Sequence, residues 1–319
     1  MFRHKNTFYF FVLVLSVFMV EQCQNPGPTQ SGIEFSKNWL DVDYVGDGIK
    51  GHKLDIHLPK NGKAPFPIIV CIYGSAWFSN NSKTTTFSWG LGQRLLKEGF
   101  AVVSINYRSS NDAKFPAQIN DVKAAIRYIR ANSSVYSLDS NFIGIAGWSS
   151  GGHLSALTGT TNALKSATIN GLDVDIEGNL GEFTQASSKV NAVVDWFGPT
   201  DFLIMDSCGG SSFKHDDENS PESSLIGVAI QKNKDRVALA NPNNYANRSN
   251  PPFLIFHGDE DASVPHCQSE RLYSKLRQEG VRSELVIVRG GQHGPGVLIE
   301  KYYDKMVAFF KVELKRIKM

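Results

Sequence analysis

The chain has 319 residues, of which 41% are hydrophobic and 20% are charged. This length and composition are typical of a globular enzyme with one large buried core. The 33 basic and 31 acidic residues are mixed along the chain and leave a formal net charge of +2, which argues against nucleic acid as a partner.

The N-terminus has the features of an export signal. The basic stretch Arg3–Lys5 precedes an apolar run over Phe8–Val20 that is too short to span a bilayer comfortably. We therefore expect residues 1–25 to be a signal peptide, residues 26–35 to be a linker, and the protein to be secreted or held at the periplasm or cell surface. An uncleaved membrane anchor is the alternative.

The four cysteines leave the anchoring and the disulfide pattern open. Cys23 follows the apolar run, so a lipid anchor at Cys23 is a second alternative, although Met19–Gln22 fits a lipoprotein signal poorly. Removal of the signal leaves Cys71, Cys208 and Cys267, an odd number that cannot all pair within one chain. We therefore expect that disulfides do not define this fold.

After the linker, short apolar runs bounded by turn residues alternate with amphipathic stretches. This alternation predicts a mostly parallel, eight-stranded sheet with helices on both faces, opened by an antiparallel pair. The predicted strands are Leu40–Val45, Lys53–Leu58, Ile68–Tyr73, Ala101–Asn106, Phe142–Ala146, Val190–Trp196, Phe253–His257 and Glu284–Val288. The predicted helices are Phe115–Ala131, Gln268–Gln278 and Glu300–Ile317.

A nucleophilic serine is indicated at the end of the fifth predicted strand. The strand Phe142–Ala146 enters Gly147-Trp148-Ser149-Ser150-Gly151-Gly152, after which a helix can begin at His153. A G-x-S-x-G sequence between a strand and a helix is the nucleophile elbow of the α/β-hydrolase fold, in which flanking glycines avoid backbone collisions. Ser149 has the required spacing and Ser150 does not, so we assign only the Ser150 backbone N–H a role, as an oxyanion donor.

The acid and the base of such a site follow the serine in the order Ser, Asp or Glu, His. His293 is the best candidate base, because it lies in a glycine-rich loop directly after the last predicted strand. His153, His257 and His266 are rivals, each with an alternative structural role at a helix or at a strand end. The acid must lie between Ser149 and this histidine.

Five motifs together resemble the branch of the α/β-hydrolases that contains bacterial feruloyl and acetyl-xylan esterases and related lipases. They are Y-G-S-A-W at 73–77, G-W-S-S-G-G-H at 147–153, V-V-D-W-F-G-P-T-D-F at 193–202, S-P-E-S-x-L-I-G at 220–227 and H-G-D-E-D-A-S-V-P-H at 257–266. The resemblance covers residues 40 to 315. It implies that Asp261 is the triad acid, with Asp259 and Glu260 as alternatives.

The resemblance also implies an oxyanion loop at Tyr73-Gly74-Ser75-Ala76-Trp77, in place of the usual H-G-G-G-W. Because Ser75 and Ala76 still carry backbone N–H groups, we expect both to be oxyanion donors together with Ser150. Trp77 and Trp196 lie next to strand ends and are candidates for substrate binding, with plain packing as the alternative.

The sequence therefore predicts an exported serine esterase of the α/β-hydrolase fold over residues 36–319, with a polar insertion at about 206–250 over the active site. Its expected substrates are small acyl or aryl esters, such as acetyl or feruloyl groups on plant polysaccharides. An arylformamidase-like amidase and a non-catalytic binding protein are the alternatives. We expect no metal, no cofactor and no membrane span in the mature form, because metal-ligand and dinucleotide motifs are not found in the sequence.

Overall fold

The structure is a computed structural model that describes residues 32, 34–162 and 164–319. The predicted signal peptide, most of the linker and Cys23 lie outside these residues. Within them, no helix combines the length and the apolar character needed to cross a membrane.

Eight strands form one sheet in the order β1-β2-β4-β3-β5-β8-β9-β10. β2 pairs antiparallel with both β1 and β4, and all other neighbours are parallel, which confirms the predicted mostly parallel sheet with an antiparallel opening. The strands are β1 (Lys37–Asp43), β2 (Lys53–Leu58), β3 (Phe66–Ile72), β4 (Ala101–Ile105), β5 (Leu138–Trp148), β8 (Ala192–Trp196), β9 (Phe253–Gly258) and β10 (Ser283–Val288).

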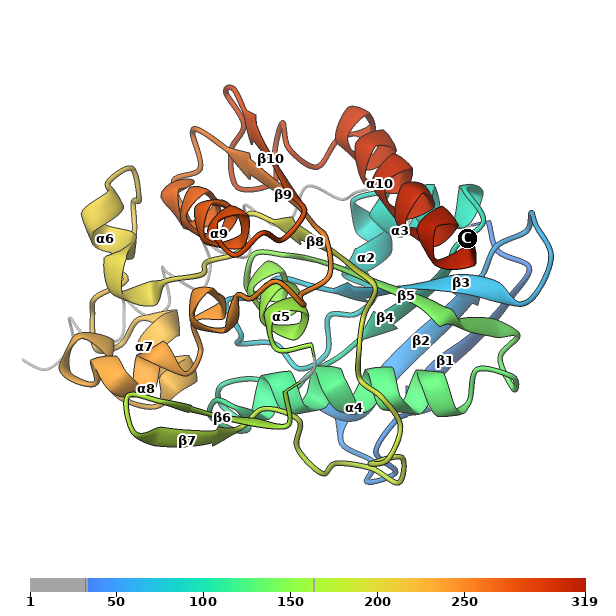
Figure 1. Cartoon of the computed structure of the whole chain (residues 1–319), viewed down its shortest axis with the longest axis horizontal. Coiled ribbons are helices and arrows are strands. Elements are labelled where there is room, and N and C mark those ends of the chain that lie inside the picture. The colour runs from blue at the N-terminus through green and yellow to red at the C-terminus, as the bar shows by residue number, and fades with distance from the viewer. Residues whose placement is uncertain (1–31, 33, 163) are drawn as a thin grey trace, which may run out of the picture.

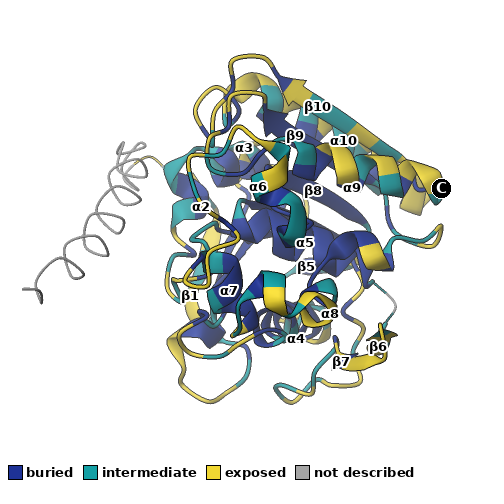
Figure 2. Cartoon of the chain, turned by 90° about the vertical axis from the view of Figure 1, so that its left-hand side faces the viewer, coloured by how far each residue is buried: buried dark blue, intermediate teal, exposed yellow. Residues whose placement is uncertain are grey.

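Helices cover both faces of this sheet (Figure 1). α3 (Leu91–Lys97) and α10 (Glu300–Lys318) contact each other on one face. The other face carries α4 (Ala117–Ala131) and α5 (Ser150–Thr160), with α9 (Cys267–Gln278) joined to α5 through the short helix η5 (Pro242–Tyr245). Figure 2 shows the sheet buried between exposed outer elements. This arrangement explains why the middle strands are almost wholly apolar.

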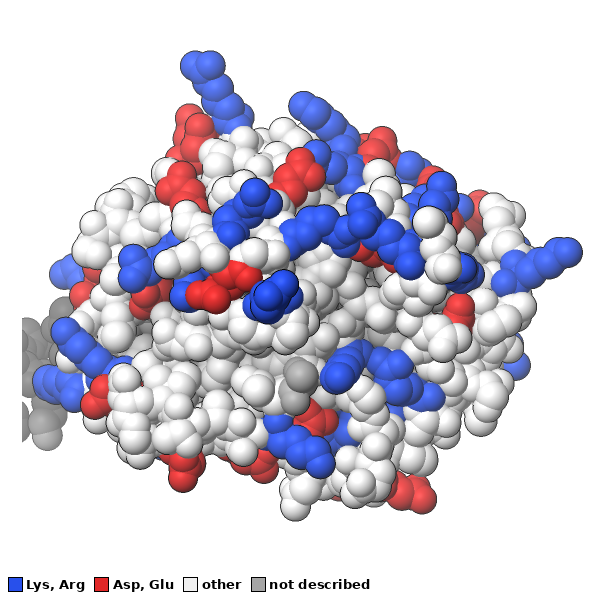
Figure 3. Space-filling view, in the orientation of Figure 1, with Lys and Arg blue, Asp and Glu red and all other residues white. Residues whose placement is uncertain are grey.

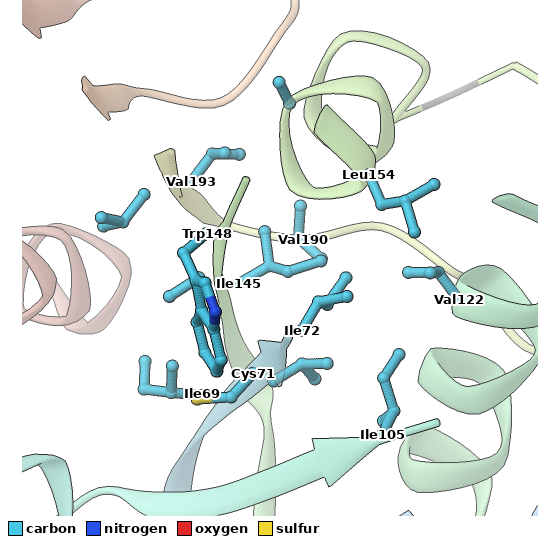
Figure 4. Close-up of a cluster of buried hydrophobic side chains, with 14 of the residues drawn as sticks. Ile69, Cys71, Ile72, Ile105, Val122, Ile145, Trp148, Leu154, Val190 and Val193 are labelled. Atoms are coloured by element: carbon cyan, nitrogen blue, oxygen red, sulfur yellow. The ribbon is translucent and has the colours of Figure 1, made fainter. Parts of the chain in front are cut away.

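The core beneath the nucleophile turn is made of aliphatic side chains from the central strands. Figure 4 shows Ile69 and Cys71 of β3 and Ile145 of β5 around the indole of Trp148, which is the last residue of β5. Leu154 of α5 packs into the same cluster from the helix side. This packing holds the end of β5 and the start of α5 in fixed relation.

The segment between β8 and β9 contains only short helices and loops. One of them, α7 (Pro221–Ile226), starts after the cap Ser220, whose Oγ accepts the Ser223 N–H at 3.0 Å, and ends before the cap Gly227 with φ of 83°. The short helices here are η3 (Phe202–Ile204), α6 (Met205–Cys208), α7 (Pro221–Ile226), η4 (Ile230–Lys232), α8 (Lys234–Ala238) and η5.

Several short elements elsewhere were not predicted from the sequence. They are η2 (Lys50–His52), α2 (Thr85–Ser88), α3 and the two-stranded hairpin of β6 (Ser166–Ile169) and β7 (Leu172–Asp175). On the surface, Figure 3 shows acidic side chains lying among the basic ones on the face drawn. This mixture agrees with the near-neutral net charge.

Candidate active site

Ser149 lies on a strained turn between β5 and α5, as the strand–turn–helix pattern predicts. Its backbone has φ of 54° and ψ of −125°, which costs an L-residue on the order of 1–3 kcal/mol. The flanking glycines make this turn feasible: a Cβ on Gly147 would lie 2.2 Å from the Gly151 oxygen, and a Cβ on Gly151 would lie 2.2 Å from the Ile72 oxygen. Glycine is therefore required on both sides of the serine.

Ser149, His293 and Asp261 form one hydrogen-bonded chain. Nε2 of His293 lies 3.0 Å from Ser149 Oγ, and Nδ1 lies 2.7 Å from Asp261 Oδ2. An ionised carboxylate can only accept, so Nδ1–H donates to Asp261 and Nε2 is left to accept the hydroxyl proton of Ser149. The imidazole is thus held in the tautomer that general-base catalysis needs.

The carboxylate of Asp261 is buried and held from both sides. Oδ1 accepts the backbone N–H groups of Ser263 and Val264 at 2.8 and 2.9 Å. His257 lies 3.4 Å from Oδ2, while its Nε2–H donates to the Val264 carbonyl at 2.8 Å. Burial alone would raise the pKa of Asp261, but His293 and His257 outweigh it and hold the pKa well below its usual range. These contacts therefore favour the ionised carboxylate of Asp261.

The neighbouring acids have other surroundings. Asp259 is exposed, and its Oδ1 accepts the Gly290 N–H at 2.6 Å. Glu260 is also exposed at the loop surface. Of the three acids in this loop, Asp261 is the one that contacts His293.

The rival histidines also have other partners. Nε2 of His153 lies 2.8 Å from the Ala240 carbonyl, and burial lowers the pKa of His153 to about 4. His257 is buried beside Asp261, with Nδ1 accepting from the Ser269 hydroxyl at 2.7 Å. His266 lies 3.8 Å from Glu270 at the surface.

The loop after β3 lies directly against the nucleophile, because a Cβ on Gly74 would lie 2.6 Å from Ser149 Cβ. The Ser75 N–H, however, donates to Ser150 Oγ at 2.9 Å, which corrects the prediction that Ser75 is an oxyanion donor. The N–H groups of Ala76 and Ser150 have no hydrogen-bond partner among the described residues. Of the three predicted donors, the N–H groups of Ala76 and Ser150 therefore remain.

Ala76 and Trp77 both have positive φ, at 50° and 60°. The left-handed region costs a residue with a Cβ about 1–2 kcal/mol. The loop therefore follows a path suited to glycine, although its residues are not glycines.

Trp77 and Trp196 do not line a binding surface, which corrects the prediction that they bind substrate. Their side chains are 1% and 0% exposed. Trp77 packs edge-on against Phe202, and Trp196 stacks on Phe256 with ring centroids 4.1 Å apart. The sequence placed both residues next to strand ends but did not show which way their side chains point. Both indole rings point into the core. Phe78, which follows Trp77 in the loop after β3, is 43% exposed.

A disulfide joins Cys208 at the end of α6 to Cys267 at the start of α9, and Cys71 is a buried free thiol. The sequence did not predict this pairing, but one cysteine does stay unpaired, as the odd number requires. Next to this bond, the Ser212 N–H donates to the Ala262 carbonyl at 2.8 Å, beside Asp261. The segment between β8 and β9 is thus attached covalently to the start of α9 and by a hydrogen bond to the acid loop.

Comparison with known proteins identifies the family. The BD-FAE family model matches residues 54–276, which is more than half of the chain. The chain belongs to the BD-FAE family. This membership and the sheet topology confirm the predicted α/β-hydrolase fold and the resemblance to esterases of that fold.

Curated relatives are similar over most of the chain. Esterase LipC of Mycobacterium tuberculosis is 32% identical over 222 residues, covering 67% of this chain and 49% of its own length. The chain spans about half the length of the curated relatives it matches.

Two solved structures are more similar. A truncated form of a carbohydrate esterase from gut microbiota is 46% identical with a TM-score of 0.85, covering 90% of this chain and 99% of that chain. A bifunctional GH43-CE protein of Bacteroides eggerthii is 52% identical with a TM-score of 0.82, covering 86% of this chain and 35% of that chain.

Proposed function

We propose that this protein is a serine carboxylic-ester hydrolase that removes acyl groups from carbohydrates. The observation that carries the proposal is the hydrogen-bonded chain from Ser149 through His293 to Asp261, with the serine on a strained turn. The N–H groups of Ala76 and Ser150, which have no hydrogen-bond partner in the described part of the chain, supply the anion-stabilising donors that acyl transfer needs.

In this mechanism, Ser149 Oγ attacks the ester carbonyl carbon while His293 Nε2 takes the hydroxyl proton. The carbonyl oxygen becomes an oxyanion facing the N–H groups of Ala76 and Ser150. His293 then gives the proton to the leaving alcohol oxygen, and an acyl-enzyme remains on Ser149. Water, deprotonated by His293, attacks the acyl-enzyme carbonyl carbon, and the bond to Ser149 Oγ breaks as His293 returns the proton to that oxygen, which releases the acid and restores the free enzyme. Asp261 stabilises the imidazolium in both steps.

A carbohydrate substrate is supported by the two similar structures. The relatives at 46% and 52% identity are named as a carbohydrate esterase and as a GH43-CE bifunctional protein. We propose acetyl and feruloyl groups on plant polysaccharides as the acyl groups.

A substrate panel tests the proposed activity. We expect hydrolysis of p-nitrophenyl acetate in preference to longer chains, and release of acid from acetylated xylan or methyl ferulate. A fluorophosphonate probe is expected to label the wild-type protein at Ser149. A folded wild-type protein that hydrolyses none of these esters and takes up no label would contradict the proposal.

We also propose export, with cleavage between Val20 and Ser31. The Cys208–Cys267 disulfide supports this, because disulfides persist in oxidising compartments outside the cytosol. N-terminal sequencing and the intact mass of native protein test it. A protein that begins at Met1 would contradict cleavage, and a diacylglycerol mass on Cys23 would establish the lipid anchor.

A further inference from the structure

Three hydroxyl groups meet behind the oxyanion loop, in a cluster that the proposed mechanism does not use. Tyr107 Oη lies 3.2 Å from Ser150 Oγ and 3.3 Å from Ser75 Oγ. Tyr107 and Ser150 are buried, with 0% and 1% of their surface exposed. Tyr107 follows β4, Ser75 follows β3 and Ser150 follows the nucleophile, so the cluster joins three separate segments of the chain.

The protons of this cluster have one consistent arrangement. The Tyr73 carbonyl can only accept, so Tyr107 Oη donates to it at 3.2 Å. Burial raises the pKa of Tyr107 to about 12, so the phenol keeps this proton at neutral pH. With its own proton used, Tyr107 Oη has lone pairs for the hydroxyl protons of Ser75 and Ser150. Ser150 Oγ is then free to accept the Ser75 N–H at 2.9 Å.

The same hydroxyls close the oxyanion loop on itself. Ser75 Oγ accepts the Ser79 N–H at 3.2 Å, and the Phe78 N–H donates to the Ser75 carbonyl at 2.9 Å. Tyr73 Oη donates to the Ser79 carbonyl at 2.8 Å, and its ring stacks on Tyr107 with centroids 4.7 Å apart. The loop from 73 to 79 is therefore held at several points around Ala76.

These contacts determine where the Ala76 N–H points. Its φ of 50° is unfavourable for alanine, so the loop keeps this path only if its surroundings hold it there. The Ser75 N–H, one peptide before Ala76, is fastened to Ser150 Oγ, and this orients the next peptide group, which carries the Ala76 N–H.

We propose that the hydroxyls of Ser150 and Tyr107 are positioning groups that aim the Ala76 N–H at the oxyanion. Ser150 then has two roles: its backbone N–H is a donor, and its side chain fixes the other donor. This inference rests on the proposed esterase function, because only an acyl-transfer reaction needs the oxyanion donors.

Two variants test the inference on the full-length protein. Ser150→Ala keeps the backbone N–H but removes the acceptor of the Ser75 N–H, and Tyr107→Phe keeps the ring but removes the shared hydroxyl. For each we expect kcat on p-nitrophenyl acetate to fall about tenfold to a hundredfold, less than the roughly 10²–10³-fold loss of a whole oxyanion donor, with KM changed less than twofold. In the double variant the losses should be less than multiplicative, because both changes release the same loop.

Matched controls separate positioning from general damage. Ser155 lies in the same helix α5, is equally buried, and within the described chain its hydroxyl has no partner, so Ser155→Ala should leave kcat unchanged. Tyr303→Phe removes another buried phenol that donates to the Trp89 carbonyl, and it should also leave kcat unchanged.

A trifluoromethyl ketone, which forms a tetrahedral oxyanion on the serine, gives a readout that mere structural damage would not move. Its inhibition constant should rise in Ser150→Ala and Tyr107→Phe by the same factor as kcat falls. Folded variants with kcat and this constant within twofold of wild type would overturn the inference. A wild-type protein without esterase activity or fluorophosphonate labelling would instead overturn the proposed function.

Discussion

The two sides of Ser149 are built on different principles. In the proposed mechanism, His293 and Asp261 act through their side chains on one side, with Nε2 of His293 3.0 Å from Ser149 Oγ and its Nδ1 2.7 Å from Asp261 Oδ2. On the other side, Ala76 and Ser150 offer backbone N–H groups, whose directions depend on φ and on hydroxyls from other segments. The role of a side chain can be predicted from residue types and their order along the chain. The role of a backbone N–H depends on where that group points, which the sequence does not show.

The two sides should also differ in their tolerance of change. The side with His293 and Asp261, called the relay side, depends on one imidazole and one buried carboxylate, so the loss of either side chain breaks the hydrogen-bonded chain. The side with Ala76 and Ser150, called the oxyanion side, has two N–H groups held by several contacts. The loss of one contact should therefore weaken oxyanion binding without abolishing it. Substitutions on the two sides can measure this difference.

The largest effect is expected at the residue that both sides share. Ser149→Ala should lower kcat on the order of 10⁵–10⁶-fold, because the nucleophile itself is lost. Initial rates on p-nitrophenyl acetate measure this, and circular dichroism checks the fold. Since the triad acts as one unit, Ser149→Ala combined with His293→Ala should cost little more than either change alone. Multiplicative losses would contradict a shared relay.

The second-largest effect is expected from Asp261→Asn on the relay side. The amide can donate to Nδ1 and so stabilise the wrong imidazole tautomer, and kcat should fall about 10⁴-fold. Asp259→Asn is the matched control, because it lies in the same loop, contacts the Gly290 N–H and keeps an oxygen acceptor. If Asp259→Asn proves the more damaging change, the assignment of the acid is wrong.

Loss of the disulfide, which lies close to the loop that carries Asp261, is expected to lower the stability of the protein. Replacing Cys208 and Cys267 together by serine should lower the free energy of unfolding by about 2–4 kcal/mol, because the unfolded chain gains freedom. Chemical denaturation with and without reductant measures this. Wild-type protein in reductant should match the variant. An unchanged midpoint in both experiments would show that the bond does not contribute.

The smallest effect is expected on the oxyanion side, from Ala76→Gly. Glycine adopts the φ of 50° without strain but gains more freedom on unfolding, so stability should change by no more than about 1 kcal/mol, with stabilisation favoured. Activity should stay near wild type in this variant. In the Ser150→Ala variant, the loop has lost the hydrogen bond from the Ser75 N–H. Ala76→Gly should lower kcat further there, because glycine gives this loop more conformational freedom. Equal effects in both backgrounds would contradict the positioning role.

Much of the fold could be predicted because its strands are buried on both faces. The run Phe253–His257 is wholly apolar up to its last residue and matches β9 within one residue. Strand ends were less clear: β5 begins at Leu138, four residues before the predicted start, where the chain becomes polar. The β6–β7 hairpin was missed because its side chains are mostly exposed and its two strands are only four residues each.

Some residues of the candidate site could also be predicted from the sequence, and others could not. Chain order and local glycines led to Ser149 and His293, and the family motif led to Asp261; the structure brings the three together. Ser75 was misassigned because a sequence does not show which acceptor an N–H group will find, and Ser150 Oγ comes from a segment 75 residues away.

Pairing of the cysteines was missed for a related reason. An odd number of cysteines shows only that one stays unpaired, and neither the pair nor the free thiol is identified by counting.

The Cys208–Cys267 bond closes a covalent ring that contains most of the insertion, all of β9 and Asp261, whereas Ser149 and His293 lie outside it. A protease that cuts once within the loop around Gly227–Ala229 would therefore leave a nicked molecule whose two pieces stay joined. On a denaturing gel without reductant the cut chain would migrate as one band, and reductant would separate it into two fragments. The acid would then be supplied by a different polypeptide from the serine, within a molecule that still holds both.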